Sequence, residues 1–145
     1  MIPNLFDDSR IAWQTLAGIE HLHYSILDID EQHNIIDVLF KFAARQQIVL
    51  HRHKVLNKTF VIQGEHILYH ADGQLKEVRA VGSYTSSEAS QDPHREGGGD
   101  IDVIVLFSIR GSSGVLYEIL DAEFNVIATL GMQDFVDLYH KQRAH

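Results

Sequence analysis

The sequence predicts an all-β protein of a single domain. Short segments rich in branched and aromatic residues follow one another at near-regular spacing, separated by Gly, Asn and Asp turn signals. A chain of 145 residues is long enough to bury one core. Many short strands with glycine turns are typical of a sandwich or a barrel.

The expected elements run in chain order from an N-terminal arm to a C-terminal helix. Residues 1–20 form the arm, which carries Trp13 and Leu16 and packs on the body of the protein as an extended segment or a short helix. The barrel occupies residues 21–132, and residues 133–145 form an amphipathic helix, expected over 133–141, and a tail. The predicted strands cover residues 22–27, 35–42, 47–51, 59–62, 66–69, 78–81, 102–109, 114–119 and 126–129. Residues 86–99, with Pro93 and three glycines, are expected to form a long functional or mobile loop.

Composition narrows the classes of function. The formal net charge is −8 with His neutral, which argues against a nucleic-acid partner because phosphates attract a basic surface. No apolar run is long enough to predict a membrane span, and the N-terminus lacks the features of a secretory signal. With no cysteine the chain has no thiolate metal site. We therefore expect a cytoplasmic protein whose partner is a small molecule or a second copy of the chain.

The pattern His51-Arg52-His53 is the strongest functional signal. It ends a run of strand-forming residues, and side chains at i and i+2 of a strand point to the same face. Neutral imidazoles are good ligands for first-row divalent metals. The pair therefore predicts a metal site, with Arg52 facing away from it.

The remaining histidines are weighed by their position. His94 follows Pro93 in the long loop and is the candidate for a third ligand, and His70 is a candidate for a fourth. His21 and His23 repeat the His-x-His pattern without a hairpin glycine at the right distance. We interpret this second pair as structural or as surface residues.

These motifs resemble the cupin superfamily. The pair His51-x-His53 followed by Gly64 has the layout of the first cupin motif, although Asn57 or Lys58 stands where that motif has an acid. The stretch from Gly82 to His94 resembles the second motif. The resemblance implies a double-stranded β-helix, that is, a jelly-roll barrel, with His51, His53 and His94 as ligands of one metal ion.

Two groups of cupins are similar to this chain in more detail. Residues 109–111, 115–117 and 119–127 look like the ending of 2,4'-dihydroxyacetophenone dioxygenases. Residues 11–14 and 125–128 look like the acetylacetone-cleaving dioxygenases. Both resemblances imply a non-haem Fe(II) enzyme that uses O2 to cleave a C–C bond next to a carbonyl, in a small diketone or an aryl hydroxyketone. Analogy with cupins also implies a homodimer, paired through edge strands or the Trp13 arm.

A second function remains open. The chain also resembles the zinc-binding cupin domain of some anti-sigma factors, which implies a non-catalytic metal-holding sensor. A sensor favours a closed coordination shell, completed here by His70, whereas an enzyme needs an open position. A site of four nitrogens suits Zn, Ni or Cu at least as well as Fe. The number of ligands therefore separates the two functions.

Overall fold

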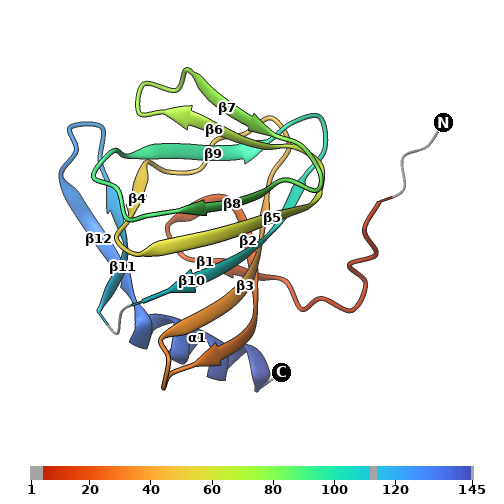
Figure 1. Ribbon diagram of the computed structural model, residues 1–145, viewed down its shortest axis with the longest axis vertical. Helices are drawn as coiled ribbons and strands as arrows, with labels where there is room; N and C mark the ends of the chain where they lie inside the picture. The colour runs from red at the N-terminus through yellow and green to blue at the C-terminus, as the bar shows by residue number, and fades with distance from the viewer. Residues whose placement is uncertain (1–4, 112–113, 145) are drawn as a thin grey trace.

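The structure is a computed structural model that describes residues 5–111 and 114–144. Within these residues the chain forms a series of β-strands followed by one C-terminal helix (Figure 1). The elements are β1 (Gln14–Leu16), β2 (Ile19–Asp30), β3 (Ile35–Phe42), β4 (His51–His53), β5 (Leu56–Gln63), β6 (His66–His70), β7 (Leu75–Arg79), β8 (Tyr84–Ser87), β9 (His94–Gly98), β10 (Val103–Arg110), β11 (Val115–Leu120), β12 (Val126–Gly131) and α1 (Met132–Arg143).

The strands form two six-stranded sheets. Their orders are β1-β2-β3-β10-β5-β8 and β12-β11-β4-β9-β6-β7, and the strand pairs are antiparallel. From β3 to β10 the pairs are nested, since β3 pairs with β10, β4 with β9, β5 with β8 and β6 with β7. Nested antiparallel pairs shared between two sheets define a jelly roll. The predicted all-β single domain is confirmed.

The core lies between the two sheets. Strand alternation places Val38, Val61 and Val105 on the inner face of one sheet and Leu116 on that of the other, and all four are almost fully buried. Burying each such side chain contributes about 1.5–3 kcal/mol. Helix α1 lies across one end of the barrel and adds Met132, Phe135 and Val136 to the same core (Figure 1). Strands β6 and β7 and the loops beside them lie at the opposite end of the barrel (Figure 1).

The segment predicted to be a long loop, residues 86–99, forms strand for part of its length. Strand β9 runs through it, and Gly97 and Gly98 belong to the strand. A Cβ atom on Gly97 would lie 1.8 Å from the carbonyl oxygen of Gln46, so only glycine fits beside that crossing chain. The glycine run therefore reflects close packing of two backbones, which the sequence pattern does not distinguish from a flexible loop.

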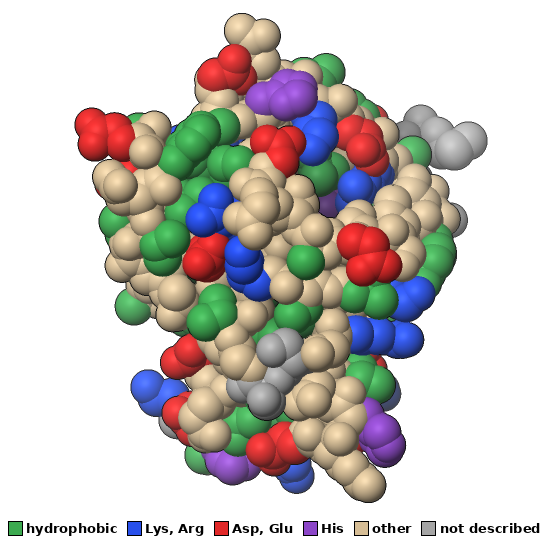
Figure 2. All heavy atoms as spheres, turned by 60° about the vertical axis from the view of Figure 1, so that its left-hand side comes forward, with side chains coloured by type: hydrophobic (Ala, Val, Ile, Leu, Met, Phe, Trp, Pro, Cys, Tyr) green, Lys and Arg blue, Asp and Glu red, His purple; other side chains and the backbone are tan. Residues whose placement is uncertain are grey.

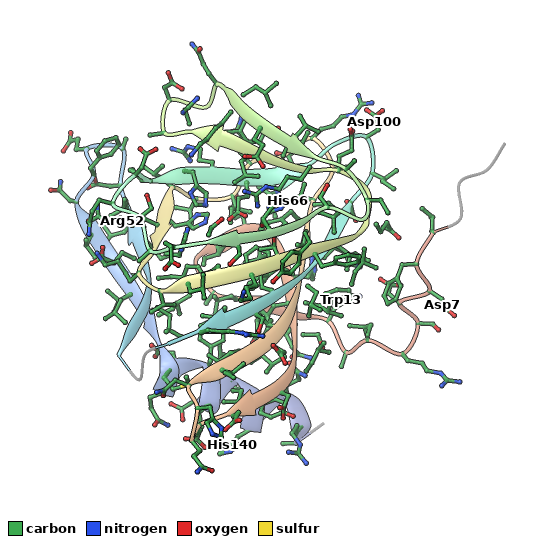
Figure 3. The ribbon with its side chains drawn as sticks, viewed as in Figure 1. Asp7, Trp13, Arg52, His66, Asp100 and His140 are labelled. Carbon is green, nitrogen blue, oxygen red and sulfur yellow. The ribbon has the colours of Figure 1, made fainter. Side chains whose placement is uncertain are left out.

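The N-terminal segment joins the barrel through β1, which pairs with β2. Residues 5–13 contain no helix or strand. The indole Nε1 of Trp13 donates to Asp8 Oδ2 at 2.9 Å, and Lys41 Nζ lies 3.0 Å from the same oxygen. Figure 3 shows Trp13 where this segment meets the barrel.

The surface carries charges of both signs. On the face that includes β11 and β12, acidic and basic side chains are interspersed among exposed apolar ones (Figure 2). In the described part of the chain, no helix has both the length and the apolar character needed to cross a bilayer.

Candidate metal centre

Two neighbouring strands bring the candidate ligands together. His51 on β4 lies directly opposite His94 on β9 in the antiparallel ladder. Glu96 follows His94 by two positions, so its side chain points to the same inner face of the sheet. All three side chains are buried.

The three residues offer donor atoms at metal-like spacing. One ligand atom from each of His51, His94 and Glu96 lies within 4.8 Å of the other two. Glu96 Oε2 is 2.7 Å from His51 Nε2 and 3.5 Å from His94 Nε2. Two atoms bound at right angles to one metal, each at about 2.1 Å, lie about 3.0 Å apart. The separations fit a single small cation between two imidazoles and one carboxylate.

The backbone orients the two imidazoles of the motif. Nδ1 of His51 donates to the carbonyl of Val49 at 2.8 Å, and Nδ1 of His53 donates to that of Val55 at 2.9 Å. A carbonyl only accepts, so the proton of each neutral ring lies on Nδ1 and Nε2 keeps its lone pair. Hydrogen bonds of this kind fix the tautomer of metal-binding histidines. The Nε2 of His51 can therefore bind a metal, or carry a second proton beside Glu96.

Electrostatics favour a charged carboxylate. Burial alone would raise the pKa of Glu96, but hydrogen bonds with His51, His66 and His94 outweigh it and hold that pKa well below its ordinary value. Burial also works to lower the pKa of His51, yet the contact with Glu96 raises it overall. The pKa of His94 is lowered, chiefly by burial. The centre thus holds an ionised carboxylate, and His94 is biased toward the neutral form that binds metal.

The other predicted ligands take different positions. His53 is half-buried and lines the same small pocket, with its ring centroid 6.0 Å from that of His94. His70 pairs with His94 in the ladder between β6 and β9, but its side chain is exposed at the strand end. The structure therefore brings His51 and His94 together and places His53 next to them, whereas His70 lies outside this group. Metal binding by these four residues stays a prediction.

Asn57, one of the two positions where an acid was expected, has a structural role. Asn57 is buried, accepts a hydrogen bond from the hydroxyl of Tyr117 and donates to the carbonyl of Val55 at 3.1 Å. Burial raises the pKa of Tyr117 well above its ordinary value, so the phenol stays protonated. Asn57 thus ties β5 to β11 beside the pocket, and the carboxylate of the centre comes from β9 instead.

Two spaces meet at this centre. A pocket of about 30 Å³ is lined by polar residues that include His53, Asn57 and Arg79. A second space of about 50 Å³ extends toward α1 and is almost entirely apolar. His51 and Glu96 line both. A ligand at the centre would therefore meet polar groups on one side and apolar groups on the other.

Sequence reasoning missed Glu96 and His66. Glu96 stands two positions after His94, the same spacing as between His51 and His53, but the sequence pattern of its segment predicts a loop. His66 was assigned only to a strand, yet it is fully buried and its Nε2 lies 2.7 Å from Glu96 Oε1. Recognising β9 as a strand would have revealed Glu96, whereas nothing in the sequence pairs His66 with it.

Comparison with solved structures shows that the chain has the cupin fold. An RmlC-like cupin protein from Ralstonia eutropha JMP134 matches with a TM-score of 0.72 and 21% identity, over 92% of this chain and 82% of that one. An acetylacetone dioxygenase from Acinetobacter johnsonii matches with a TM-score of 0.71 and 12% identity, over 98% and 92% of the two chains. The anti-sigma ChrR complex with SigE from Rhodobacter sphaeroides matches with a TM-score of 0.54 and 20% identity, over 68% of this chain and 48% of that one. The predicted resemblance to cupins is confirmed at the level of fold.

Sequence comparisons add nothing to this assignment. No protein-family model matches the chain, and no curated protein matches it.

Proposed function

We propose that the protein is a mononuclear metal-dependent dioxygenase that uses O2 to cleave a C–C bond next to a carbonyl in a small diketone or aryl hydroxyketone. The observation that carries this proposal is the buried group of His51, His94 and Glu96, with donor atoms within 4.8 Å of one another. Two imidazoles and one carboxylate with open positions are typical of non-haem Fe(II) oxygenases. Iron(II) is therefore the proposed metal, with Zn or Ni as alternatives.

The polar pocket supplies the groups that such a reaction needs. A metal bound there would act as a Lewis acid on the substrate oxygens. Arg79 lines the pocket, and its guanidinium, which also contacts Glu77 and Thr85, can stabilise the negative charge of an enolate. His53 also lines the pocket and has its lone pair on Nε2, so it can accept the proton that the substrate loses, or bind the metal as a further nitrogen. Substituting His53 by Ala separates these roles, because only the second lowers metal content.

The size and dryness of the site also support a small organic substrate. The apolar space toward α1 is lined by Phe107, Phe135 and Leu138 among others, and these side chains exclude water from the inner side of the centre. An apolar group attached to a carbonyl carbon fits this environment. Exclusion of water also strengthens every electrostatic interaction at the site.

The sensor function has less support. It required His70 to complete a closed shell, and the His70 side chain is exposed and lies outside the group of donor atoms. With His51, His94 and Glu96 as the only ligands, one coordination position would stay open, as an enzyme requires, whereas His53 as a fourth ligand would close a tetrahedral shell.

The test begins with the metal. Protein purified without added metal is analysed for its metal content, loaded with Fe(II), and assayed for O2 uptake with diketones and with hydroxyacetophenones. We expect about one metal per chain and uptake with at least one substrate. Stoichiometric Zn without uptake on any carbonyl compound would instead support the sensor.

Substitutions then locate the site. His51→Ala is expected to abolish metal binding because it removes a donor from the centre. His23→Ala is the matched control, since it alters the other His-x-His pair, whose residues are exposed. Unchanged metal content in His51→Ala would show that the site lies elsewhere.

A further inference from the structure

A third buried histidine contacts the carboxylate of the centre from the side away from the candidate ligands. His66 on β6 is fully buried, and its Nε2 lies 2.7 Å from Glu96 Oε1. The other oxygen, Oε2, is the one that faces His51 and His94. Figure 3 shows His66 inside the barrel. The two oxygens of Glu96 therefore have separate partners.

The hydrogen bonding of His66 defines its tautomer. A carboxylate only accepts, so Nε2 carries the proton that it shares with Glu96. Nδ1 is buried and has no hydrogen-bond partner within the described part of the chain. Nε2 is therefore the nitrogen through which the ring donates to Glu96.

Packing from the opposite sheet holds the ring in place. The Phe42 ring stacks on it with centroids 5.4 Å apart and an interplanar angle of 8°. The Phe107 ring meets it nearly edge-on at 6.0 Å. Both aromatic residues belong to the sheet that faces β6. Because the imidazole cannot turn without disturbing this stack, its donor has a fixed direction.

We propose that His66 is a positioning residue that holds Glu96 as a one-oxygen metal ligand. Its Nε2–H occupies Oε1, leaving Oε2 for the metal between His51 and His94. A carboxylate that could chelate through both oxygens would fill a further coordination position. His66 therefore keeps that position available for a substrate or O2. This inference rests on the metal site of the proposed function, although it does not depend on the reaction that the site performs.

The tautomer can be tested in the unmodified protein. Nitrogen-15 NMR of the histidine rings in metal-free protein reports which nitrogen carries the proton. We expect the Nε2 of His66 to carry a proton. A ring protonated on Nδ1 alone would overturn the proposal. No substitution is needed, so this test does not depend on a variant that folds.

The positioning role is tested by three variants with graded reach. His66→Gln places an amide N–H near the position of Nε2, His66→Asn carries the same amide too short to reach Glu96, and His66→Leu removes the donor while keeping an apolar side chain. Metal affinity is measured by competition with a chromophoric chelator, and coordination by the visible spectrum of the Co(II)-loaded protein. Loss of such a partner lowers metal affinity by about 10–100-fold.

We expect this loss, together with a changed Co(II) spectrum, in the Asn and Leu variants, and values close to wild type in the Gln variant. A merely structural role for His66 predicts no difference between Gln and Asn. Wild-type affinity and spectrum in His66→Leu would overturn the proposal, as would an unmodified protein that binds no metal. If the unmodified protein binds metal but consumes no O2, the dioxygenase function fails and the role of His66 stands.

Discussion

His51 Nε2 and Glu96 Oε2 lie 2.7 Å apart in the interior of the barrel, although the two residues are separated by 45 positions in the chain. Both side chains are only 6% exposed. A buried ion pair contributes little net stability by comparison with apolar residues of the same shape, but removing one partner is costly. The pair is therefore better explained by metal chemistry than by stability alone.

Replacing Glu96 by Gln keeps the shape of the side chain and removes its charge. We expect metal affinity to fall sharply and the free energy of unfolding of the metal-free protein to fall by about 1.5–3 kcal/mol, the contribution of hydrogen bonds to a charged group. The measurement is urea unfolding of metal-free protein. Glu118→Gln is the control, because its ion pair with Arg52 is partly exposed and screened by solvent, so its loss should cost less stability. Equal losses in the two variants would contradict a special role for Glu96.

Acid should release the N-terminal segment. Hydrogen bonds from Lys41 and from the Trp13 indole lower the pKa of Asp8 below its ordinary value of 3.8. A lowered pKa in the folded state means that the contact stabilises the fold above pH 3.8, and that this stabilisation is lost as pH falls through the lower folded value.

Trp13 is the only tryptophan, so its fluorescence reports this event directly. We expect its emission to change in acid below the ordinary pKa of Asp8, and Asp8→Asn to show the changed emission already at neutral pH. Asp7→Asn is the control, because the Asp7 carboxylate accepts a hydrogen bond from the nearby Ser9, whereas the Trp13 indole donates to Asp8. Identical titrations of Trp13 emission in Asp8→Asn and the unmodified protein would exclude the contact.

Gly97 should be intolerant of any side chain. A methyl group there would meet the Gln46 carbonyl oxygen at 1.8 Å, so β9 or the segment before β4 must move. We expect Gly97→Ala to lower the unfolding free energy by at least about 2 kcal/mol, as overpacking of a core does, and to weaken metal binding. Gly82→Ala is the comparison, since it adds strain at a positive φ but meets no atom within 4 Å. Metal affinity should be unchanged in Gly82→Ala, and retention of affinity in Gly97→Ala would contradict the packing argument.

The space beside the centre should limit the substrate. The apolar side offers about 50 Å³. An engineered apolar cavity that binds benzene has about 150 Å³. We therefore expect short alkyl diketones to react faster than diketones with an aryl substituent. Leu138→Ala should reduce the difference in kcat/KM between the short alkyl and the aryl diketones, because the smaller side chain enlarges this space. Leu138 lines the space and is only partly buried. Leu75→Ala is the control, because Leu75 is exposed. A preference of the unmodified protein for aryl diketones would contradict the size limit.

Local sequence patterns were sufficient to predict most of the strands. Val103–Arg110 and Ile35–Phe42 are rich in branched residues, and both were predicted nearly to their observed ends. The prediction was less accurate for the region before β4, because the strand predicted at residues 47–51 is observed at residues 51–53. There the chain runs beside β9 through bonds such as Ile48 N–H to the Glu96 carbonyl, without forming a regular ladder.

By itself, the sequence determined the class of fold and the first half of the candidate centre. Period-two alternation is local, so it placed His51 and His53 on one strand and predicted the sheets. The tertiary structure alone decided that the carboxylate is Glu96 on β9, that His70 lies outside the centre, and that His66 contacts the far oxygen of Glu96. These contacts join residues on different strands, and their distances depend on register and on the packing of one sheet against the other, which no local pattern records.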